Sequence, residues 1–264
     1  MLQLTKISKL FNPGTPDEKI ALMNINLHFQ PGDFVTVIGS NGAGKSTLMN
    51  IISGVMKPDI GTVSIEGAPI QNYPEHERSR WIGRVFQDPM AGTAPRMTIE
   101  ENLSMAYMRG KKRGFAWGTT TAKRQMFREQ LARIGIGLED RLTAKVGLLS
   151  GGERQALSLL MATFTKPQIL LLDEHTAALD PARAELITKL TEEIVRDLHL
   201  TTLMVTHNME QAIRLGNRLI MMDKGQIILD IPQERKKGLT VERLLSEFEK
   251  ISGHQLSDDR IVLG

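Results

Sequence analysis

Residues 39–47 combine glycines, a lysine and two hydroxyl side chains at a spacing that can bind phosphate. The segment reads Gly39-Ser40-Asn41-Gly42-Ala43-Gly44-Lys45-Ser46-Thr47. It matches the pattern G-x-x-x-x-G-K-[ST], in which glycines let backbone N–H groups surround a phosphate chain. Lys45 brings a cation to the β- and γ-phosphates, the Ser46 hydroxyl can ligate Mg²⁺, and Thr47 places a second hydroxyl near the α-phosphate. We therefore expect a nucleoside triphosphate site here rather than an ordinary glycine-rich turn.

A pair of carboxylates supplies the second half of this chemistry. The apolar run Ile169–Leu172 ends in Asp173-Glu174, which places both acids at the carboxyl end of a buried strand, where open α/β sheets bind ligands. Asp173 can hold the water shell of Mg²⁺, and Glu174 can reach a water aligned on the γ-phosphate. Alone, such a pair is a solvated strand end or a helix cap. Together with the phosphate loop, the pair is instead expected to take part in chemistry at the bound phosphates.

Alternating strand and helix patterns indicate the elements that position these residues. Short apolar runs that predict parallel strands occur at Phe34–Ile38, Ile82–Phe86, Ile169–Leu172, Thr202–Val205 and Leu219–Met222. A helical run, Leu48–Ser53, follows the phosphate loop. Antiparallel strands are expected at Leu2–Ile7, Ala21–Phe29 and Thr62–Ile65. The pattern predicts an α/β core with a mainly parallel sheet and a small antiparallel β subdomain.

Helical patterns dominate the middle and the end of the chain. Ile99–Met108 and Ala122–Ile134 predict a helical insert over about residues 98–165. The chain is expected to turn through Ile231-Pro232, after which apolar residues recur at helical spacing from Val241 to Phe248 behind a possible Thr240 cap. We interpret residues 1–230 as one domain and residues 231–264 as its helical extension, docked on the main core.

Composition excludes several other classes of protein. The 264 residues are 41% hydrophobic and 24% charged, which is ordinary for a globular chain. The absence of cysteine excludes disulfides, thiolate metal sites and cysteine nucleophiles, and a net charge of +3 is weak support for nucleic-acid binding. No secretory signal and no apolar run of membrane-spanning length occur. We expect a cytoplasmic chain that touches a membrane only as a peripheral partner.

Leu149-Ser150-Gly151-Gly152-Glu153, shortly before the acidic strand, resembles the signature of the ATP-binding subunits of ABC transporters. The resemblance covers about residues 2–230 and implies a P-loop NTPase core. Further motifs occur in the family order: Gln87 is similar to the Q-loop glutamine, Ala178-Leu179-Asp180 to the D-loop, and His207 to the switch histidine. Phe11 stands where the family carries an aromatic residue that stacks on adenine.

The resemblance implies that ATP and Mg²⁺ are bound between two subunits arranged head to tail. Ser150 and Gly152 of one chain would complete the site formed by Lys45 and Glu174 of the other. A helix starting at Ser150-Gly151-Gly152 offers N–H groups, a hydroxyl and a positive dipole end, which suit a terminal phosphate. By resemblance alone, Gln87 contacts the metal and senses the membrane partner.

Single residues leave alternatives open. His207 can be a strand-end histidine with satisfied hydrogen bonds, and Phe11 can be an edge aromatic that covers the core. The chain also departs at three positions from the residues that are commonest in the family's motifs: it has Glu153 in place of Gln, His175 in place of Pro and Ala177 in place of Ser. Glu153 places a carboxylate at a helix start, near the phosphate. His175 adds a titratable ring beside the presumed base, or is a solvated spacer.

One stretch is rich in basic residues, with no acid before Glu129. They are Arg109, Lys111, Lys112, Arg113, Lys123, Arg124 and Arg128. Such a run is either a solvated loop of the helical insert or a patch that faces anionic lipid headgroups.

The motifs together predict the ATP-hydrolysing subunit of a transporter at the cytoplasmic face of the membrane. Its expected partners are a separate transmembrane permease, a second ATPase subunit, and an extracytoplasmic solute-binding protein. A homodimer is expected, although a heterodimer stays open, and no direct contact with nucleic acid is expected. The sequence around the signature and the acidic strand resembles that of ATPases of amino-acid uptake systems. Two alternatives are a soluble ABC ATPase acting on ribosomes or DNA, and a small-molecule kinase that uses the same loop.

Overall fold

The computed structural model describes residues 1–111 and 118–252, which form two compact units. The first unit contains Met1–Arg78 and the chain from Leu200 onward, and the second contains Ser79–His199.

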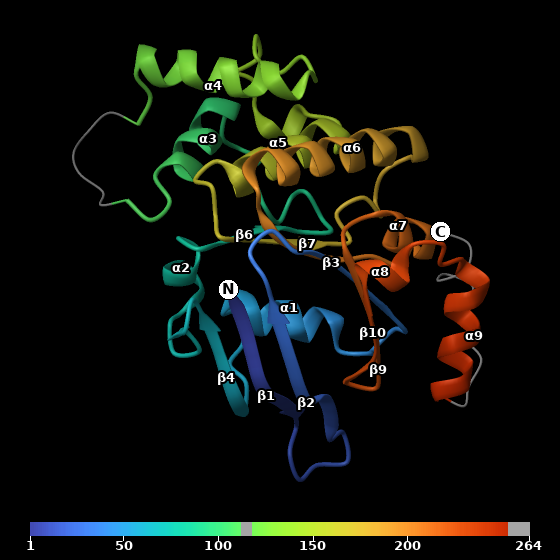
Figure 1. Cartoon of the computed structure of the whole chain (residues 1–264). Coiled ribbons are helices and arrows are strands. Elements are labelled where there is room, and N and C mark those ends of the chain that lie inside the picture. Colours follow the sequence, from blue (N-terminus) through green and yellow to red (C-terminus); the bar gives the residue numbers. More distant parts are fainter. Residues whose placement is uncertain (112–117, 253–264) are drawn as a thin grey trace. The chain divides into compact units, whose positions relative to one another are not determined.

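The first unit begins with an antiparallel sheet (Figure 1). Its strands are β1 (Leu2–Phe11), β2 (Lys19–Phe29), β4 (Ile60–Ile65) and β5 (Ala68–Pro69), in the order β2-β1-β4-β5. Leu2, Leu4 and Ile7 of β1 are buried, as expected for a sheet with one face on the core. The predicted antiparallel subdomain is confirmed.

Mainly parallel strands carry the phosphate loop in the same unit. They are β3 (Phe34–Gly39), β8 (Thr201–Val205), β9 (Arg218–Asp223) and β10 (Gln226–Pro232), in the order β10-β9-β3-β8. Strand β3 pairs in parallel with β8 and β9, and all its residues are buried, which explains its predominantly apolar sequence.

The turn predicted at Ile231-Pro232 is wrong. Both residues belong to β10, which pairs antiparallel with β9 through Ile231 and Leu219. A proline is tolerated there because Pro232 is the last residue of the strand, where the missing N–H interrupts little pairing.

Helices cover the strands of the first unit. They are α1 (Lys45–Ser53), α2 (Glu75–Arg78), α7 (Met209–Arg214), α8 (Gln233–Lys236) and α9 (Val241–Ser252). Leu244 and Phe248 of α9 are buried in one cluster with Ile38 and Met209. The backbone N–H of Arg243 donates to the Thr240 hydroxyl, 3.3 Å away. The C-terminal helix therefore docks on the core, as predicted.

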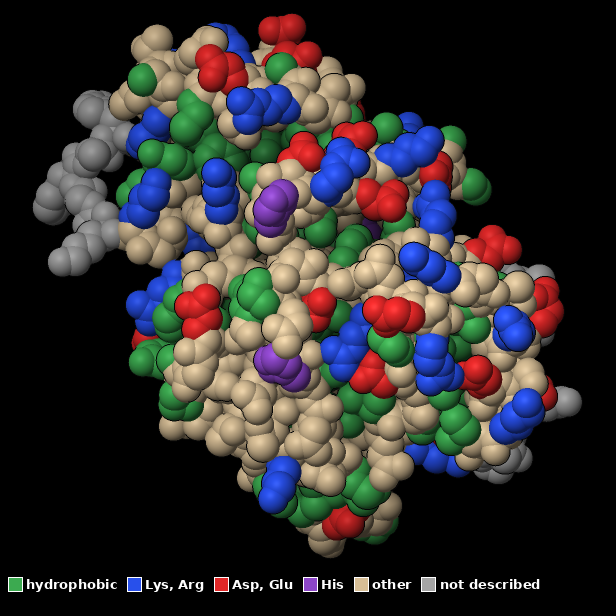
Figure 2. Space-filling view, in the orientation of Figure 1, with side chains coloured by type: hydrophobic (Ala, Val, Ile, Leu, Met, Phe, Trp, Pro, Cys, Tyr) green, Lys and Arg blue, Asp and Glu red, His purple; other side chains and the backbone are tan. Residues whose placement is uncertain are grey.

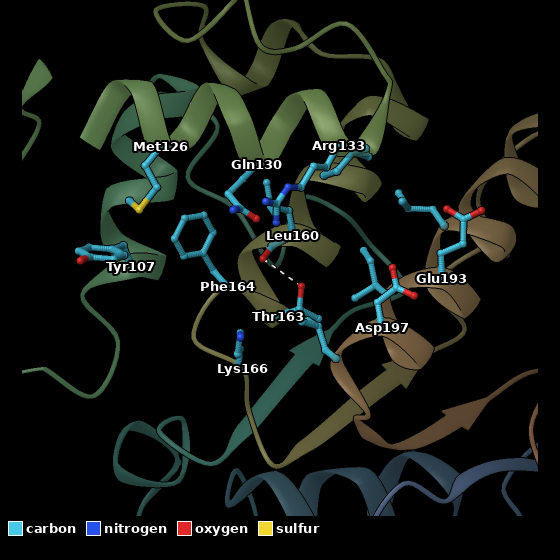
Figure 3. A pocket seen from close by; sticks show the side chains of 14 residues that line it. Tyr107, Met126, Gln130, Arg133, Leu160, Thr163, Phe164, Lys166, Glu193 and Asp197 are labelled. Atoms are coloured by element: carbon cyan, nitrogen blue, oxygen red, sulfur yellow. Dashed lines mark hydrogen bonds between the residues drawn. The ribbon is translucent and has the colours of Figure 1, made fainter. Parts of the chain in front are cut away.

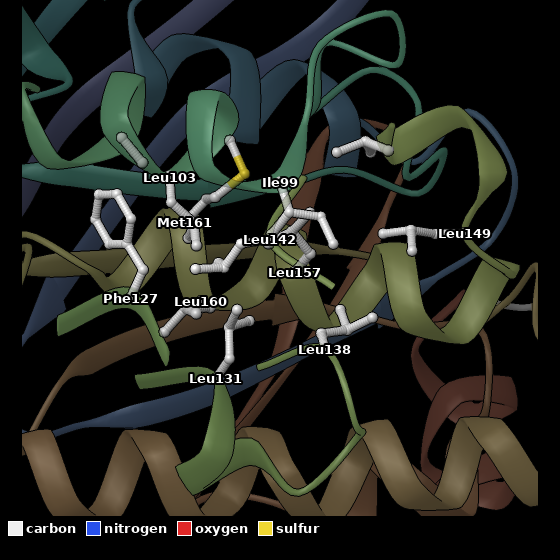
Figure 4. Packing of buried hydrophobic residues seen from close by; sticks show 12 residues of the cluster. Ile99, Leu103, Phe127, Leu131, Leu138, Leu142, Leu149, Leu157, Leu160 and Met161 are labelled. Carbon is white, nitrogen blue, oxygen red and sulfur yellow. The ribbon is translucent and has the colours of Figure 1, made fainter. Parts of the chain in front are cut away.

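The second unit combines two parallel strands with a group of helices. They are β6 (Ile82–Val85), β7 (Ile169–Asp173), α3 (Ile99–Tyr107), α4 (Thr121–Ile134), the 3₁₀ turn η1 (Val146–Leu148), α5 (Gly151–Thr163) and α6 (Pro181–Leu198). Leu103, Phe127, Leu131 and Leu157 from three helices meet in one fully buried cluster (Figure 4). The described part of the expected insert is helical.

Candidate nucleotide site

Close backbone approach fixes the conformation of the phosphate loop between β3 and α1. Gly44 has φ of 101°, and a Cβ there would lie 2.4 Å from the Ala21 carbonyl oxygen. At Gly39 a Cβ would lie 2.1 Å from the Met222 carbonyl oxygen. Only glycine fits at both positions. Gly44 precedes α1 without a side-chain cap, so the start of this helix is built from backbone N–H groups, which suit an anion.

Lys45 folds back over the loop that it follows. Its ammonium donates to the Gly39 carbonyl oxygen at 2.6 Å and to the Ser40 carbonyl oxygen at 3.0 Å. The side chain is only 6% exposed, whereas Ser46 is exposed and Thr47 half-buried. The carbonyl groups of Gly39 and Ser40 therefore hold the Lys45 ammonium at the phosphate loop. Ser46 lies at the surface.

Residues that the sequence analysis did not identify support the loop from the β9–β10 turn. The Ser40 hydroxyl donates to Asp223 at 2.9 Å, and the Gly225 N–H donates to the Ala43 carbonyl oxygen at 3.1 Å. Asp223 ends β9, the parallel neighbour of β3. No spacing signal links these residues to the loop, because 183 positions separate Ser40 from Asp223.

Phe11 is the last residue of β1. It is half-buried and pairs with Lys19 across β1 and β2. The Lys19 ammonium lies 3.4 Å from the place that a Cβ at Gly42 would take. The pairing brings an aromatic ring and a second cation near the loop. This agrees with adenine stacking without removing the edge-aromatic alternative.

His207 follows β8 at the same edge of the sheet as the phosphate loop. Strands β3 and β8 run parallel with Val37 opposite Val205, so their carboxyl ends lie side by side. The Thr206 N–H donates to the Val37 carbonyl oxygen at 3.2 Å, and His207 is half-buried. The first unit therefore places the phosphate loop and His207 at one edge of the sheet.

The acidic pair and Gln87 lie together in the second unit. Strands β6 and β7 are parallel with Val85 opposite Leu172, which places the residues that follow both strands at one edge. Asp173 is the last residue of β7, and Glu174 has φ of 45° and is half-buried. Gln87 is exposed two residues after β6. The Arg84 guanidinium, which the sequence analysis did not identify, donates to Asp173 at 2.9 Å.

His175 is neither a solvated spacer nor accessible as a base. It is 2% exposed, and its Nε2 lies 3.0 Å from the Thr191 hydroxyl of α6. Thr191 donates its own proton to the Ile187 carbonyl oxygen, so Nε2 carries the proton and donates to Thr191. Burial lowers the pKa of His175 to about 4. The expectation of a solvated spacer is wrong because α6, which no pattern had indicated, covers this position.

The signature begins α5 with a reciprocal cap. The Glu153 N–H donates to the Ser150 hydroxyl at 3.4 Å, and the Ser150 N–H donates to the Glu153 carboxylate at 2.7 Å. Arg141 donates to the other carboxylate oxygen at 2.7 Å. Burial alone would raise the pKa of Glu153, but the Ser150 backbone and hydroxyl and the Arg141 charge hold the pKa below its usual value. Glu153 is thus paired within its own unit.

The two glycines of the signature lie against Leu179 of the D-loop and against Arg183, which follows the D-loop. A Cβ at Gly151 would lie 3.4 Å from Leu179, and one at Gly152 would lie 3.1 Å from Arg183. Asp180 caps α6 by accepting a hydrogen bond from the Arg183 N–H at 3.1 Å. The second unit therefore brings the signature and Asp180 side by side.

Several charges of the basic stretch make local contacts. Arg124 binds Glu100 through two hydrogen bonds of 2.6 and 3.0 Å, and Lys111 lies 3.3 Å from the centroid of the Tyr107 ring. Burial lowers the pKa of Arg109. Lys112 and Arg113 lie outside the described residues. On the face drawn in Figure 2, Lys and Arg side chains are interspersed with Asp and Glu side chains.

A hollow of about 430 Å³ lies among α4, α5 and α6 of the second unit (Figure 3). Tyr107, Met126 and Phe164 line one end, and Glu193 and Asp197 lie at the other. None of the predicted site residues lines it, so it takes no part in the nucleotide site.

No helix within residues 1–111 and 118–252 has the length and apolar character needed to span a bilayer. The same residues contain no cluster of three or more His, Cys, Asp or Glu side chains that could hold a metal by themselves.

Comparison with known proteins places these motifs in one family. The family model described as ABC transporter matches residues 22–177, from β2 past the acidic pair. The chain is 44% identical over 249 residues to the tyrosine transport ATP-binding protein of Clostridioides difficile, covering 94% of this chain and 99% of that one. It is 33% identical over 230 residues to a choline transport ATP-binding protein of Bacillus subtilis, covering 86% of this chain and 56% of that one.

Solved structures share the fold. A dimeric ATP-binding cassette in a post-hydrolysis state bound to ADP and Pi is similar with a TM-score of 0.76 and 30% identity, covering 88% of this chain and 99% of that one. The ADP form of another ABC transporter cassette has a TM-score of 0.76 and 26% identity, covering 100% and 98%. The match removes the kinase alternative, and these relatives give no support to a soluble ATPase acting on ribosomes or DNA. From motifs, fold and likeness together, the chain belongs to the ABC transporter family, as an ATP-binding and ATP-hydrolysing subunit with the fold of the ABC ATPases.

Proposed function

We propose that this chain powers the uptake of an amino-acid-like solute through a separate membrane permease. The observation that carries the proposal is the likeness, over nearly the whole of both chains, to a protein named for tyrosine transport. The chain would associate with the membrane peripherally through the permease, and an extracytoplasmic binding protein would deliver the solute. Residues 1–230 would form the ATPase domain, including the helical insert at about 98–165, and residues 231–264 its extension.

We assign the first part of the nucleotide site to the phosphate loop. Backbone N–H groups of Gly39 to Gly44 bind the phosphate chain, and Lys45 exchanges its carbonyl partners for β- and γ-phosphate oxygens. Phe11 stacks on adenine, and Thr47 contacts the α-phosphate. The short contacts of Lys45 with Gly39 and Ser40 support this role, because they hold its ammonium at the loop before nucleotide binds.

We assign the chemical step to residues at the ends of parallel strands. Glu174 orients and deprotonates the attacking water, and His207 contacts the γ-phosphate. Ser46, Gln87 and Asp173 supply oxygen donors of the kind that Mg²⁺ prefers, so the residues present fit this metal. The ion, when bound, neutralises charge on the phosphates. Asp173, the last residue of β7, would hold the ion, and the exposed Gln87, two residues after β6, would contact it.

A second copy of the chain completes the site in this proposal. The start of α5, with Ser150, Gly151 and Gly152, faces the γ-phosphate bound by the partner, and Asp180 lies beside it. Glu153 holds the Ser150 backbone in place, and Arg141 offsets its negative charge. Two ATP molecules close the homodimer and hydrolysis reopens it.

Uptake of labelled amino acids by cells tests this function. A strain that lacks this chain loses uptake of an aromatic or related amino acid, and the wild-type gene restores it. The Lys45→Ala variant does not restore it, although it accumulates to the same level. Copurification of a hydrophobic permease with the tagged chain supports the assignment. Unchanged uptake of every amino acid in the deletion strain would contradict it.

A further inference from the structure

Asp173, the residue assigned above to the metal, already has a cationic partner. The Arg84 guanidinium lies 2.9 Å from its carboxylate, and the two side chains are only 11% and 16% exposed. An ion pair so far withdrawn from water is screened little by salt. The carboxylate that must accept Mg²⁺ is therefore already paired with a cation of the protein itself.

The pairing of β6 with β7 sets this contact. Arg84 lies opposite Leu171 in the parallel register, and Asp173 stands two residues further along the same face of β7. Phe86 is likewise two residues beyond Arg84, and its ring centroid lies 4.7 Å from the guanidinium carbon. The strand register therefore directs the guanidinium at Asp173, and the ring supports it from one side.

The signature helix is connected to the same group. Gln155 of α5 is fully buried, and its amide donates to the Phe86 carbonyl oxygen at 3.3 Å. Phe86 directly precedes Gln87, which we assign to the metal. The contact holds the backbone that carries both the ring under Arg84 and the Q-loop glutamine.

Arg84 should have opposite effects on Asp173 in the absence and in the presence of a bound divalent cation. Without metal, Arg84 stabilises a carboxylate that would otherwise be partly buried and unpaired. With a divalent cation at Asp173, the guanidinium is a like charge a few ångströms away and competes for the same oxygens. Its support by Phe86 limits how far it can withdraw.

We propose that Arg84 is a resident counter-ion of Asp173 that Mg²⁺ must displace, so that Arg84 sets the Mg²⁺ concentration at which nucleotide binds. This rests on the assignment of Asp173 to the metal. Arg84 is a positioning residue, since it acts on the metal through Asp173.

Nucleotide affinity measured against buffered free Mg²⁺ tests the proposal without requiring turnover. A fluorescent ATP analogue is titrated with the full chain at each Mg²⁺ concentration. For Arg84→Met we expect the half-saturating Mg²⁺ concentration to fall about tenfold, and for Arg84→Lys, which keeps the charge, to stay within about twofold. Arg80→Met is the matched control, because Arg80 stacks 4.1 Å from the neighbouring Trp81 ring, and it should not change the value.

The remaining outcomes separate this proposal from the function on which it rests. If the half-saturating Mg²⁺ concentration of Arg84→Met is unchanged or higher than that of the wild type, the counter-ion role is overturned. A higher concentration would make Arg84 a residue that orients Asp173 for the metal. Asp173→Asn should raise the concentration, and if it does not, the metal assignment itself fails. If Arg84→Met does not fold by circular dichroism, Arg84→Gln provides the same comparison.

Discussion

Glu174 holds a left-handed backbone conformation, with φ of 45°, directly after the buried strand β7. A non-glycine residue keeps such a conformation only where its surroundings impose it. Here the Glu174 carbonyl oxygen accepts a hydrogen bond from the Ala177 N–H at 2.9 Å, and His175 is fixed by Thr191. The backbone around the proposed base is therefore held on both sides of the turn.

Removing the charge of Glu174 should separate binding from hydrolysis. Glu174→Gln should still bind ATP with Mg²⁺ but hydrolyse it at least about 100-fold more slowly, because the attacking water loses its base. Phosphate release by the purified variant measures this. Glu193→Gln, at an exposed carboxylate of α6, is the control and should keep wild-type turnover. Equal turnover in both variants would move the role of the base to His207, since His175 is enclosed.

Acid should weaken the fold through His175. Its folded-state pKa of about 4 lies below the ordinary value of 6.5, so the unfolded chain binds the additional proton as pH falls between these values. The stability present above pH 6.5 is therefore lost toward pH 4.

Urea unfolding at several pH values measures this loss against a His175→Gln variant. Between pH 7 and pH 5 the wild type should lose about 2 kcal/mol more unfolding free energy than the variant does. The comparison uses only the pH dependence, so a constant difference in stability between the two proteins does not affect it. Parallel pH profiles would show that His175 accepts a proton in the folded chain.

At the level of the element, the phosphate loop depends on strands that are remote in sequence. Gly44 lies against the Ala21 carbonyl of β2, and Gly39 against the Met222 carbonyl of β9. The loop is therefore shaped by its neighbours as well as by its own glycines.

Gly44→Ala should be more harmful than the same change at a glycine with open surroundings. Gly32 has φ of 81° and nothing within 4 Å of an added Cβ, so Gly32→Ala should cost about 1–2 kcal/mol from backbone strain alone. Gly44→Ala adds a collision with a carbonyl oxygen and should cost at least about 3 kcal/mol, with loss of nucleotide binding. Urea unfolding compares the two. Equal costs would show that β2 does not confine the loop.

The cap of α5 should tolerate the commoner family residue. Glu153→Gln keeps a side chain that can accept from the Ser150 N–H, and it loses only the partly exposed pair with Arg141. It should cost less than about 0.5 kcal/mol, whereas Glu153→Ala, which removes the reciprocal bond, should cost about 1 kcal/mol. Thermal unfolding of the two variants checks the order. Equal losses for Gln and Ala would make the Arg141 pair, and not the cap, the important contact of Glu153.

For the whole molecule, the proposed mechanism requires a partner that contributes the signature. Ser150→Arg should leave ATP affinity of the monomer nearly unchanged, because Lys45 and the loop backbone bind the nucleotide within one chain. ATP-dependent dimerisation should be lost, because a bulky side chain then occupies the place of the partner's phosphate.

Gel filtration with ATP and Mg²⁺, in the slowly hydrolysing Glu174→Gln background, measures dimerisation. Thr120→Arg is the matched control, because Thr120 also caps a helix of the second unit, at α4. It should dimerise normally. Loss of ATP affinity in the Ser150→Arg monomer would mean that the signature contacts the nucleotide of its own chain.

The sequence by itself determined the chemistry and most of the elements. The phosphate loop, the acidic pair and the signature are local patterns, because each depends on residues adjacent in the chain. The apolar runs that predicted β3, β7 and β8 are the buried strands of the structure, since a strand buried on both faces is predominantly apolar.

Only the tertiary structure decided which distant residues hold these motifs in place. Three such contacts join residues that are between 16 and 183 positions apart in the chain. They are the hydrogen bonds between Ser40 and Asp223, between Arg84 and Asp173, and between His175 and Thr191. No periodicity reports such pairs, because strand register and helix packing create them. The same reason explains the error at Ile231-Pro232, where pairing with β9 extends a segment that local turn signals would end.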